Sequence, residues 1–193
     1  MGLLQPARAI LAPVDFSDGS RAAFTLAVRL ARHLGSRLHV LSVVDPMMAA
    51  TARKRGSDLV AEARDELQRF IEACPEAVAL TPCRDVVIGS AADAIVTIAE
   101  REQADLIVLS AHGWFRPGSR PLGSVTQQVL LRAEGSVLVV PDGWTAPDDR
   151  QDTGLGPIVV GVDYSESAAV AVRTASALGR PDSIPWAGPH RLR

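Results

Sequence analysis

The chain alternates between short runs of apolar residues and longer stretches in which apolar residues recur every three or four positions. Short apolar runs rich in β-branched residues are typical of buried strands, and the longer period is typical of helices with one buried face. The runs predict strands over residues 9–14, 37–44, 83–88, 106–109 and 137–140. The periodic stretches predict helices over residues 20–33, 59–71, 91–101 and 124–132. Gly35 is expected to end the first helix and Pro75 the second.

Strands that alternate with helices need crossover connections, which are right-handed and leave the strands parallel. A parallel sheet is covered on both faces, in agreement with the nearly continuous apolar runs of this chain. The sequence therefore predicts an α/β fold with an open, doubly wound five-stranded parallel sheet, Rossmann-like in its layers. The pattern alone does not give the order of the strands.

The segment 105–131 carries most of the candidate chemistry. Its apolar strand runs directly into a loop that holds Gly113, Gly118 and Gly123, and Ser124 is expected to cap the helix that follows. The residues expected on the buried face of that helix are Val125, Val129 and Leu130. Glycines let a ligand approach the backbone, and a helix N-terminus favours negative charge, so this arrangement favours an anion site. The alternative is a loop that only turns the chain.

The spacing within this segment excludes two common phosphate loops. No Gly-Lys-Ser/Thr follows at P-loop spacing, and no G-x-G-x-x-G follows the first strand. What the chain has is Ser110-Ala111-His112-Gly113, nine further residues, and then Gly123-Ser124. This spacing resembles the nucleotide loop of the universal stress protein family, with one departure: Ser110 stands where the family pattern has its first glycine.

Further segments resemble that family in the expected order, from Arg8 to about Pro141. They are residues 10–17, with an Asp-x-Ser after the first strand, residues 41–45, 87–89 with Ala94 and Ile95, and 137–140. The resemblance implies the strand order 3-2-1-4-5, in which the winding reverses between the first and fourth strands. Open α/β sheets bind ligands beyond the carboxyl ends of such strands. The segments 13–15 and 110–113 leave those two strands.

The resemblance further implies that ATP or a related adenine nucleotide binds there, with or without Mg. The residues expected to contact the nucleotide are Pro13, Val14, Asp15, Val43, Ser110, His112, Gly113, Gly123, Ser124 and Val125. Asp15 is also the expected metal-binding residue, through nucleotide-bound Mg; its alternative role is to cap the first helix. If Ser110 needs a positive φ, strain of about 1–3 kcal/mol weakens binding. If its φ is negative, the cost is small and the hydroxyl can donate to a phosphate.

No catalytic residue is expected. His112 could be read as a base, but no Ser-Asp pairing accompanies it, and a loop histidine held by hydrogen bonds is the better interpretation. Arg116 and Arg120 are suited to phosphates, although a solvated loop explains them equally well.

The last apolar strand suggests a partner. The run from Val137 to Val140 would expose unpaired backbone groups at the sheet edge of a monomer, so a homodimer through this edge is expected. The alternative is an edge covered by the linker or by the strand predicted over residues 158–162.

The composition and charge exclude several classes of function and location. The net charge of −2 gives no electrostatic case for nucleic acid or an anionic membrane. Cys74 and Cys83 are too few for a disulfide framework. No apolar run reaches the ~20 residues of a membrane helix, and the N-terminus lacks the apolar core of a signal peptide. A cytoplasmic location is therefore expected.

The sequence also contains an internal repeat. Residues 158–180 echo residues 10–32 at a constant offset, with identities that include Val14/Val162, Asp15/Asp163, Ser17/Ser165 and Leu30/Leu178. The predicted organisation is a complete domain over residues 1–141, a linker over 142–156, and over 157–193 a truncated second copy whose tail after Arg180 is expected to be disordered.

These observations leave three hypotheses of function. The favoured one is a nucleotide-binding universal stress protein that acts as a stress-response or regulatory module. The second is a nucleotide-free interaction module of the same fold, with the pocket closed by Ser110. The third, a slow ATP hydrolase, has the least support because no activated nucleophile or positioned base is identifiable.

Overall fold

The computed structural model describes residues 8–114, 122–148, 155, 158–161 and 166–178. The chain divides into two compact units. One is formed by Gln5–Gly154 and the other by Leu155–Arg193 together with Met1–Leu4.

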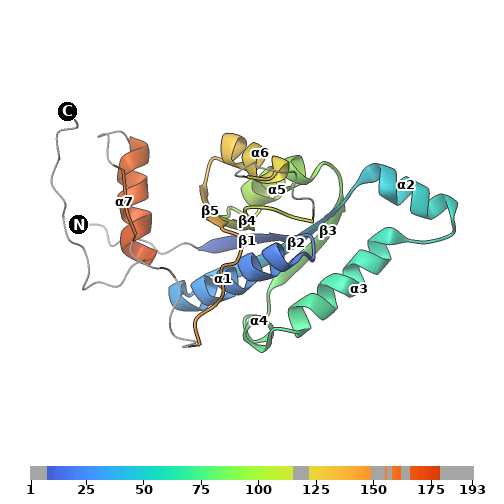
Figure 1. Ribbon diagram of the computed structural model, residues 1–193, viewed down its shortest axis with the longest axis horizontal. Helices are drawn as coiled ribbons and strands as arrows, with labels where there is room; N and C mark the ends of the chain where they lie inside the picture. Colours follow the sequence, from blue (N-terminus) through green and yellow to red (C-terminus); the bar gives the residue numbers. More distant parts are fainter. Residues whose placement is uncertain (1–7, 115–121, 149–154, 156–157, 162–165, 179–193) are drawn as a thin grey trace. The chain divides into compact units, whose positions relative to one another are not determined.

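Five parallel strands form the sheet of the first unit (Figure 1). They are β1 (Ala9–Val14), β2 (Arg37–Val44), β3 (Cys83–Ile88), β4 (Leu106–Ser110) and β5 (Ser136–Val140). Their order, β3-β2-β1-β4-β5, confirms the predicted one. Because β1 pairs with β2 on one side and β4 on the other, the winding reverses between β1 and β4. The carboxyl ends of β1 and β4 therefore meet where open sheets of this kind bind ligands.

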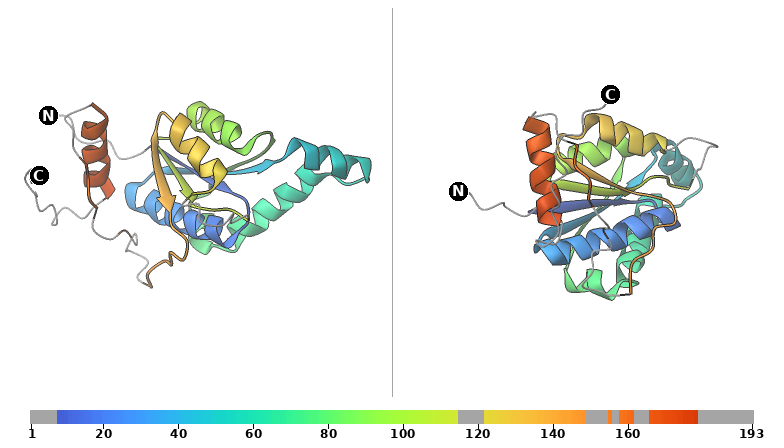
Figure 2. Two further views of the ribbon diagram at one scale, coloured as in Figure 1. Left: turned by 45° about the horizontal axis from the view of Figure 1, so that its top comes forward. Right: turned by 60° about the vertical axis from the view of Figure 1, so that its left-hand side comes forward.

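Helices cover both faces of the sheet (Figure 2). The helices α5 (Ala91–Arg101) and α6 (Ser124–Arg132) lie together on one face, and α1 (Asp18–Leu34), α3 (Leu59–Glu72) and α4 (Pro75–Ala79) lie on the other. The core under α5 and α6 is built by apolar side chains of three strands and both helices, among them Leu11, Leu41, Ile95, Ile107 and Val129. Full burial of one such side chain stabilises the fold by about 1.5–3 kcal/mol.

The first helix shows how local sequence sets its limits. It begins at Asp18, earlier than the predicted start at Ser20, because Ser17 is its N-cap. The Ser17 hydroxyl oxygen accepts the N–H of Ser20 at 3.2 Å. The helix ends at Gly35 as predicted, where a φ of 66° favours glycine.

Two helices were not predicted. No residue of α2 (Pro46–Lys54) is buried, so no apolar period marks it. Its only signal is local: the Asp45 carboxylate accepts the N–H groups of Met47 at 2.8 Å and Met48 at 3.1 Å, and proline opens the first turn. The second unpredicted helix is α4. The helix α3 before it ends at Glu72, and Pro75, which was expected only to end that helix, begins α4.

The first residues of the predicted linker contact the first unit. Arg29 Nη2 donates to the carbonyl oxygen of Pro147 at 2.7 Å. Asp142 lies 2.9 Å from a ring nitrogen of His112. Residues 142–148 are therefore held against α1 and the loop after β4.

The second unit contains the helix predicted from the internal repeat, α7 (Glu166–Leu178). The strand predicted before α7 is not formed by residues 158–161, and Val162 and the tail after residue 178 lie outside the described residues. A strand needs a neighbour to pair with, and the described residues of this unit contain no strand. In the part of the chain that the structure describes, no helix combines the length and apolarity needed to cross a membrane.

Candidate functional site

Nine of the ten predicted contact residues come from three segments at the carboxyl ends of β1 and β4. Pro13 and Val14 end β1 and Asp15 follows; Ser110 ends β4 and His112 and Gly113 follow; Gly123, Ser124 and Val125 begin α6. The tenth, Val43, lies near the end of β2, where β2 pairs with the end of β1. The topology therefore brings together what the sequence places far apart.

The start of α6 is fastened to the end of β4. The N–H of Gly123 donates to the carbonyl oxygen of Ala111 at 2.8 Å, and the Thr126 hydroxyl donates to the carbonyl oxygen of Ser110 at 2.9 Å. A Cβ at position 123 would lie 3.3 Å from the Ala111 oxygen. Gly123 has a φ of −67°, so glycine is needed there for close approach and not for an unusual backbone angle.

Two expectations about α6 are corrected. The N-cap is Gly123, not Ser124, and no side chain of the described residues caps the helix. Glycine serves as an N-cap because its extended backbone leaves the first carbonyl free to accept from Gln127. Leu130 is 42% exposed, because the buried face is narrower than predicted and centres on Val129 and Thr126.

The absence of a side-chain cap has a chemical consequence. Within the described residues, the N–H groups of Ser124, Val125 and Thr126 have no hydrogen-bond acceptor. The positive end of the helix dipole lies at the same place. Unpaired amides and a helix N-terminus together favour an anion.

Asp15 is held in place on both sides of its carboxylate. Its Oδ1 accepts the N–H of Ser17 at 3.1 Å and the Ser17 hydroxyl at 2.6 Å. Its Oδ2 accepts the N–H of Trp114 at 3.3 Å. The alternative role of Asp15 as the cap of α1 is wrong, because Ser17 is the cap and Asp15 instead holds Ser17.

The residue after Asp15 has a strained backbone. Phe16 has a φ of 66°, which is rare for an aromatic residue and costs on the order of 1–3 kcal/mol. Its ring packs edge-on against Phe70 of α3 with 5.6 Å between centroids, and Phe70 also packs against Phe24 of α1. The Arg21 guanidinium lies 4.6 Å from the centre of the Phe70 ring. This cluster holds the sharp turn that places Asp15 at the crevice.

Two glycines allow the segments to meet. A Cβ at Gly113 would lie 2.2 Å from Asp15 Oδ2, so the carboxylate rests directly against this residue. A Cβ at Gly19, in the first turn of α1, would lie 2.7 Å from the carbonyl oxygen of His112. Sequence reasoning missed Gly19; the only signal was a glycine inside a helical stretch, which usually has a packing reason.

Ser110 ends β4 and has no positive φ. The strain considered for this position is therefore absent. Its side chain lies toward α1, with Cβ 3.3 Å and Oγ 3.6 Å from where a Cβ of Gly19 would be.

His112 is held by Asp142, which supports the interpretation of a hydrogen-bonded loop histidine. Its Nδ1 lies 2.9 Å from the Asp142 carboxylate, and the His112 side chain is 12% exposed. In the part of the chain described here, no three His, Cys, Asp or Glu side chains gather as a metal site. Gly118, Arg116 and Arg120 lie outside the described residues.

A network of charged side chains lies elsewhere, around α5. The ion pair with Arg132 lowers the pKa of Asp93 below its ordinary value, and the hydrogen bond from Arg101 lowers that of Glu102. His39 of β2, which is buried, faces Asp85 at 3.4 Å and Glu102 at 3.7 Å. This network ties α5 to β2, β3 and α6.

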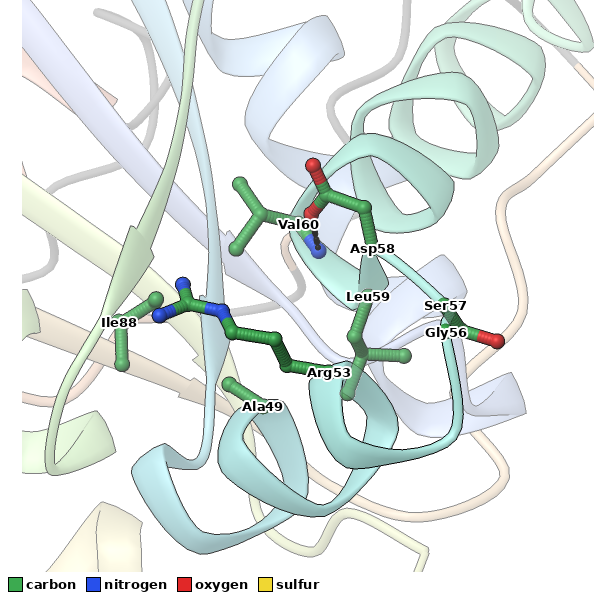
Figure 3. A pocket seen from close by; sticks show the side chains of 8 residues that line it. All are labelled: Ala49, Arg53, Gly56, Ser57, Asp58, Leu59, Val60 and Ile88. Atoms are coloured by element: carbon green, nitrogen blue, oxygen red, sulfur yellow. Dashed lines mark hydrogen bonds between the residues drawn. The ribbon is translucent and has the colours of Figure 1, made fainter.

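A hollow of about 300 Å³ lies at the end of β3, between α2 and the start of α3 (Figure 3). Arg53 extends across it from α2 toward Ile88. Its lining residues are Ala49, Arg53, Gly56, Ser57, Asp58, Leu59, Val60 and Ile88. None of them is a predicted site residue.

The fold and the site define a Rossmann-like α/β protein with an anion-favouring crevice at the reversal of its sheet. The model of the universal stress protein family matches residues 6–141. The chain belongs to the universal stress protein family.

Individual relatives agree with this assignment. The chain is 35% identical to a universal stress protein of Thermus aquaticus over 138 residues, which are 69% of this chain and 98% of the relative. It is 30% identical to one of Methanocaldococcus jannaschii over 136 residues, 68% of this chain and 80% of the relative. The solved structure of the universal stress protein UspA from Lactobacillus plantarum matches with a TM-score of 0.59 and 30% identity, covering 68% of this chain and 96% of that one.

Proposed function

We propose that the first unit binds ATP or a related adenine nucleotide in the crevice between β1 and β4. The protein then acts as a cytoplasmic stress-response or regulatory module and does not turn over a metabolite. The observation that carries this proposal is the start of α6, where three backbone amides find no acceptor among the described residues and lie beside the glycine-bearing segment that follows β4. These donors suit phosphate oxygens.

The residues divide into two groups by their place in the crevice. Gly113, Gly123, Ser124 and Val125 would hold the phosphates through backbone N–H groups, with the Ser124 hydroxyl added. The segment 13–15 and Val43, at the ends of β1 and β2, would contact the nucleoside. Ser110 and His112 would line the side of the crevice formed by β4.

Asp15 fits a role toward Mg that is carried by the nucleotide. A carboxylate is the oxygen ligand that Mg prefers, and one such ligand together with phosphates is a common arrangement. The Asp15 carboxylate already lies against Gly113, at the segment proposed to hold phosphates. Mg would neutralise the repulsion between the two anions.

Mass spectrometry of the purified protein under native conditions tests this function. We expect a mass increment of one adenine nucleotide per chain, retained in part after purification. A ligand-free chain that also fails to take up added Mg-ATP would favour the nucleotide-free interaction module. Release of ADP with time would favour the slow hydrolase.

We propose that the protein is a homodimer through β5. Among the described residues this strand pairs with β4 alone and forms an edge of the sheet, and Val137 and Val139 are partly exposed. An apolar edge strand with unpaired backbone groups favours pairing with a second copy.

We propose that residues 157–193 derive from a truncated second copy of the first strand and helix. Support comes from the offset identities and from α7, which lies where the repeat places a helix. The matched family region ends at residue 141. A short unit of this size is below the length at which chains usually fold alone, so the isolated segment is expected to show no cooperative melting.

A further inference from the structure

Trp114 makes two hydrogen bonds to Asp15 across the crevice between β1 and β4. Its backbone N–H donates to Asp15 Oδ2 at 3.3 Å, and its indole Nε1–H donates to the main-chain oxygen of Asp15 at 2.6 Å. The two residues are 99 positions apart in the chain. Trp114, in the segment after β4, thus holds both the main chain and the side chain of Asp15, which follows β1.

This contact is not a product of burial. Trp114 is 69% exposed, so packing contributes little to its position. An exposed indole that still bonds its N–H to main chain is positioned by that bond. The partner is fixed as well, because the turn at Phe16 and the bonds to Ser17 hold Asp15.

The contact also occupies the backbone N–H of Trp114, which is next in the chain to the Gly113 amide proposed to hold a phosphate. Asp15 Oδ2 takes the N–H of Trp114 and rests against Gly113. A carboxylate and a phosphate oxygen are both negative and cannot share this N–H without repulsion. A phosphate that takes the Trp114 N–H must therefore displace the carboxylate from it, which weakens the pair of hydrogen bonds between Asp15 and Trp114.

We propose that Trp114 and Asp15 form a clasp that closes the crevice in the ligand-free protein and opens when a nucleotide binds. This proposal rests on the proposed function for its ligand, but not for the clasp itself. Opening the clasp costs part of the free energy of nucleotide binding, so the clasp lowers the affinity for the nucleotide. It also disfavours anions that bring no cation to neutralise Asp15.

Two measurements on the full chain test the clasp. In the ligand-free protein, NMR hydrogen exchange of the indole N–H groups, assigned with Trp114→Phe, should show Trp114 protected. Addition of Mg-ATP should shift this signal and speed its exchange. By calorimetry, Trp114→Phe, which lacks the donor, should bind Mg-ATP about two- to tenfold more tightly, the value of one net hydrogen bond.

Trp144→Phe is the matched control, because it makes the same exchange at a tryptophan that is not among the residues proposed to contact the nucleotide, and it should bind as the wild type does. An unprotected Trp114 indole in the ligand-free protein, or a Trp114→Phe variant that binds no more tightly than wild type, overturns the clasp. Absence of binding by both proteins overturns the proposed function, and the ligand-free exchange then decides the clasp alone.

Discussion

Gly19 and His112 are in contact only because position 19 has no side chain. A Cβ there would lie 2.7 Å from the carbonyl oxygen of His112, closer than such atoms approach in proteins. The contact joins the first turn of α1 to the segment that leaves β4.

Gly19→Ala should therefore destabilise the protein by about 1–3 kcal/mol, the usual cost of overpacking a tight contact. The neighbour is backbone and cannot move away cheaply. Urea denaturation followed by circular dichroism measures the change. Gly89→Ala is the control, because a Cβ at Gly89 meets no atom within 4 Å. Equal stability of the two variants would contradict the contact.

Ser110→Gly should change the affinity for Mg-ATP by less than about threefold, which corresponds to less than ~0.7 kcal/mol. Ser110 lies at the extended end of β4 with no positive φ, so glycine relieves no strain. Calorimetry of the two proteins provides the comparison. A tenfold gain in the glycine variant would show that the serine obstructs the site.

Acid should remove part of the stability carried by α5. The pKa of Asp93 and of Glu102 is lower in the folded protein because Arg132 and Arg101 bond to them. A lowered folded-state pKa stabilises the fold above the ordinary carboxyl range, and this contribution is lost as the pH falls below about 4. Thermal melting from pH 7 to pH 3 should show Asp93→Asn less stable than wild type at pH 7, with the difference shrinking as the pH falls below the ordinary carboxyl range. A constant difference would argue against the ion pair as its cause.

Val139→Lys should convert the proposed dimer to a monomer in light scattering. A charge at the β5 edge prevents close pairing of two apolar strands. Val78→Lys on α4 is a control of similar chemistry, since Val78 is 47% exposed and lies on another element. If the mass of Val139→Lys equals that of wild type, the edge is not the interface.

The strands were predictable because each is marked by a run of apolar residues in the sequence. The runs that became β1, β4 and β5 are apolar over almost their whole length, and only a sheet covered on both faces accommodates such runs. The missed helix α2 shows the limit of this reasoning. It buries no residue, so its formation depends on the Asp45 cap and not on a periodic pattern.

The candidate site was predictable as a set of segments but not as a set of contacts. The spacing from Ser110 to Ser124 located the crevice, since parallel topology brings strand ends together. The bonds between Asp15 and Trp114 depend on how two distant segments face each other, and no local pattern encodes this. The φ of Phe16 likewise depends on its packing against Phe70.

The start of α6 is the place proposed to hold the phosphates of a nucleotide. Calorimetric titration of the full chain with Mg-ATP, on wild type and Gly123→Val, measures whether it does. Valine would push the start of α6 away from the Ala111 oxygen, which lies 3.3 Å from the position of its Cβ. We predict one site per chain in the wild type and at least about tenfold weaker binding in the variant, a loss of ~1.4 kcal/mol, while Gly89→Val binds as wild type does. Equal affinity of Gly123→Val and wild type, or no heat of binding in either, would contradict the account.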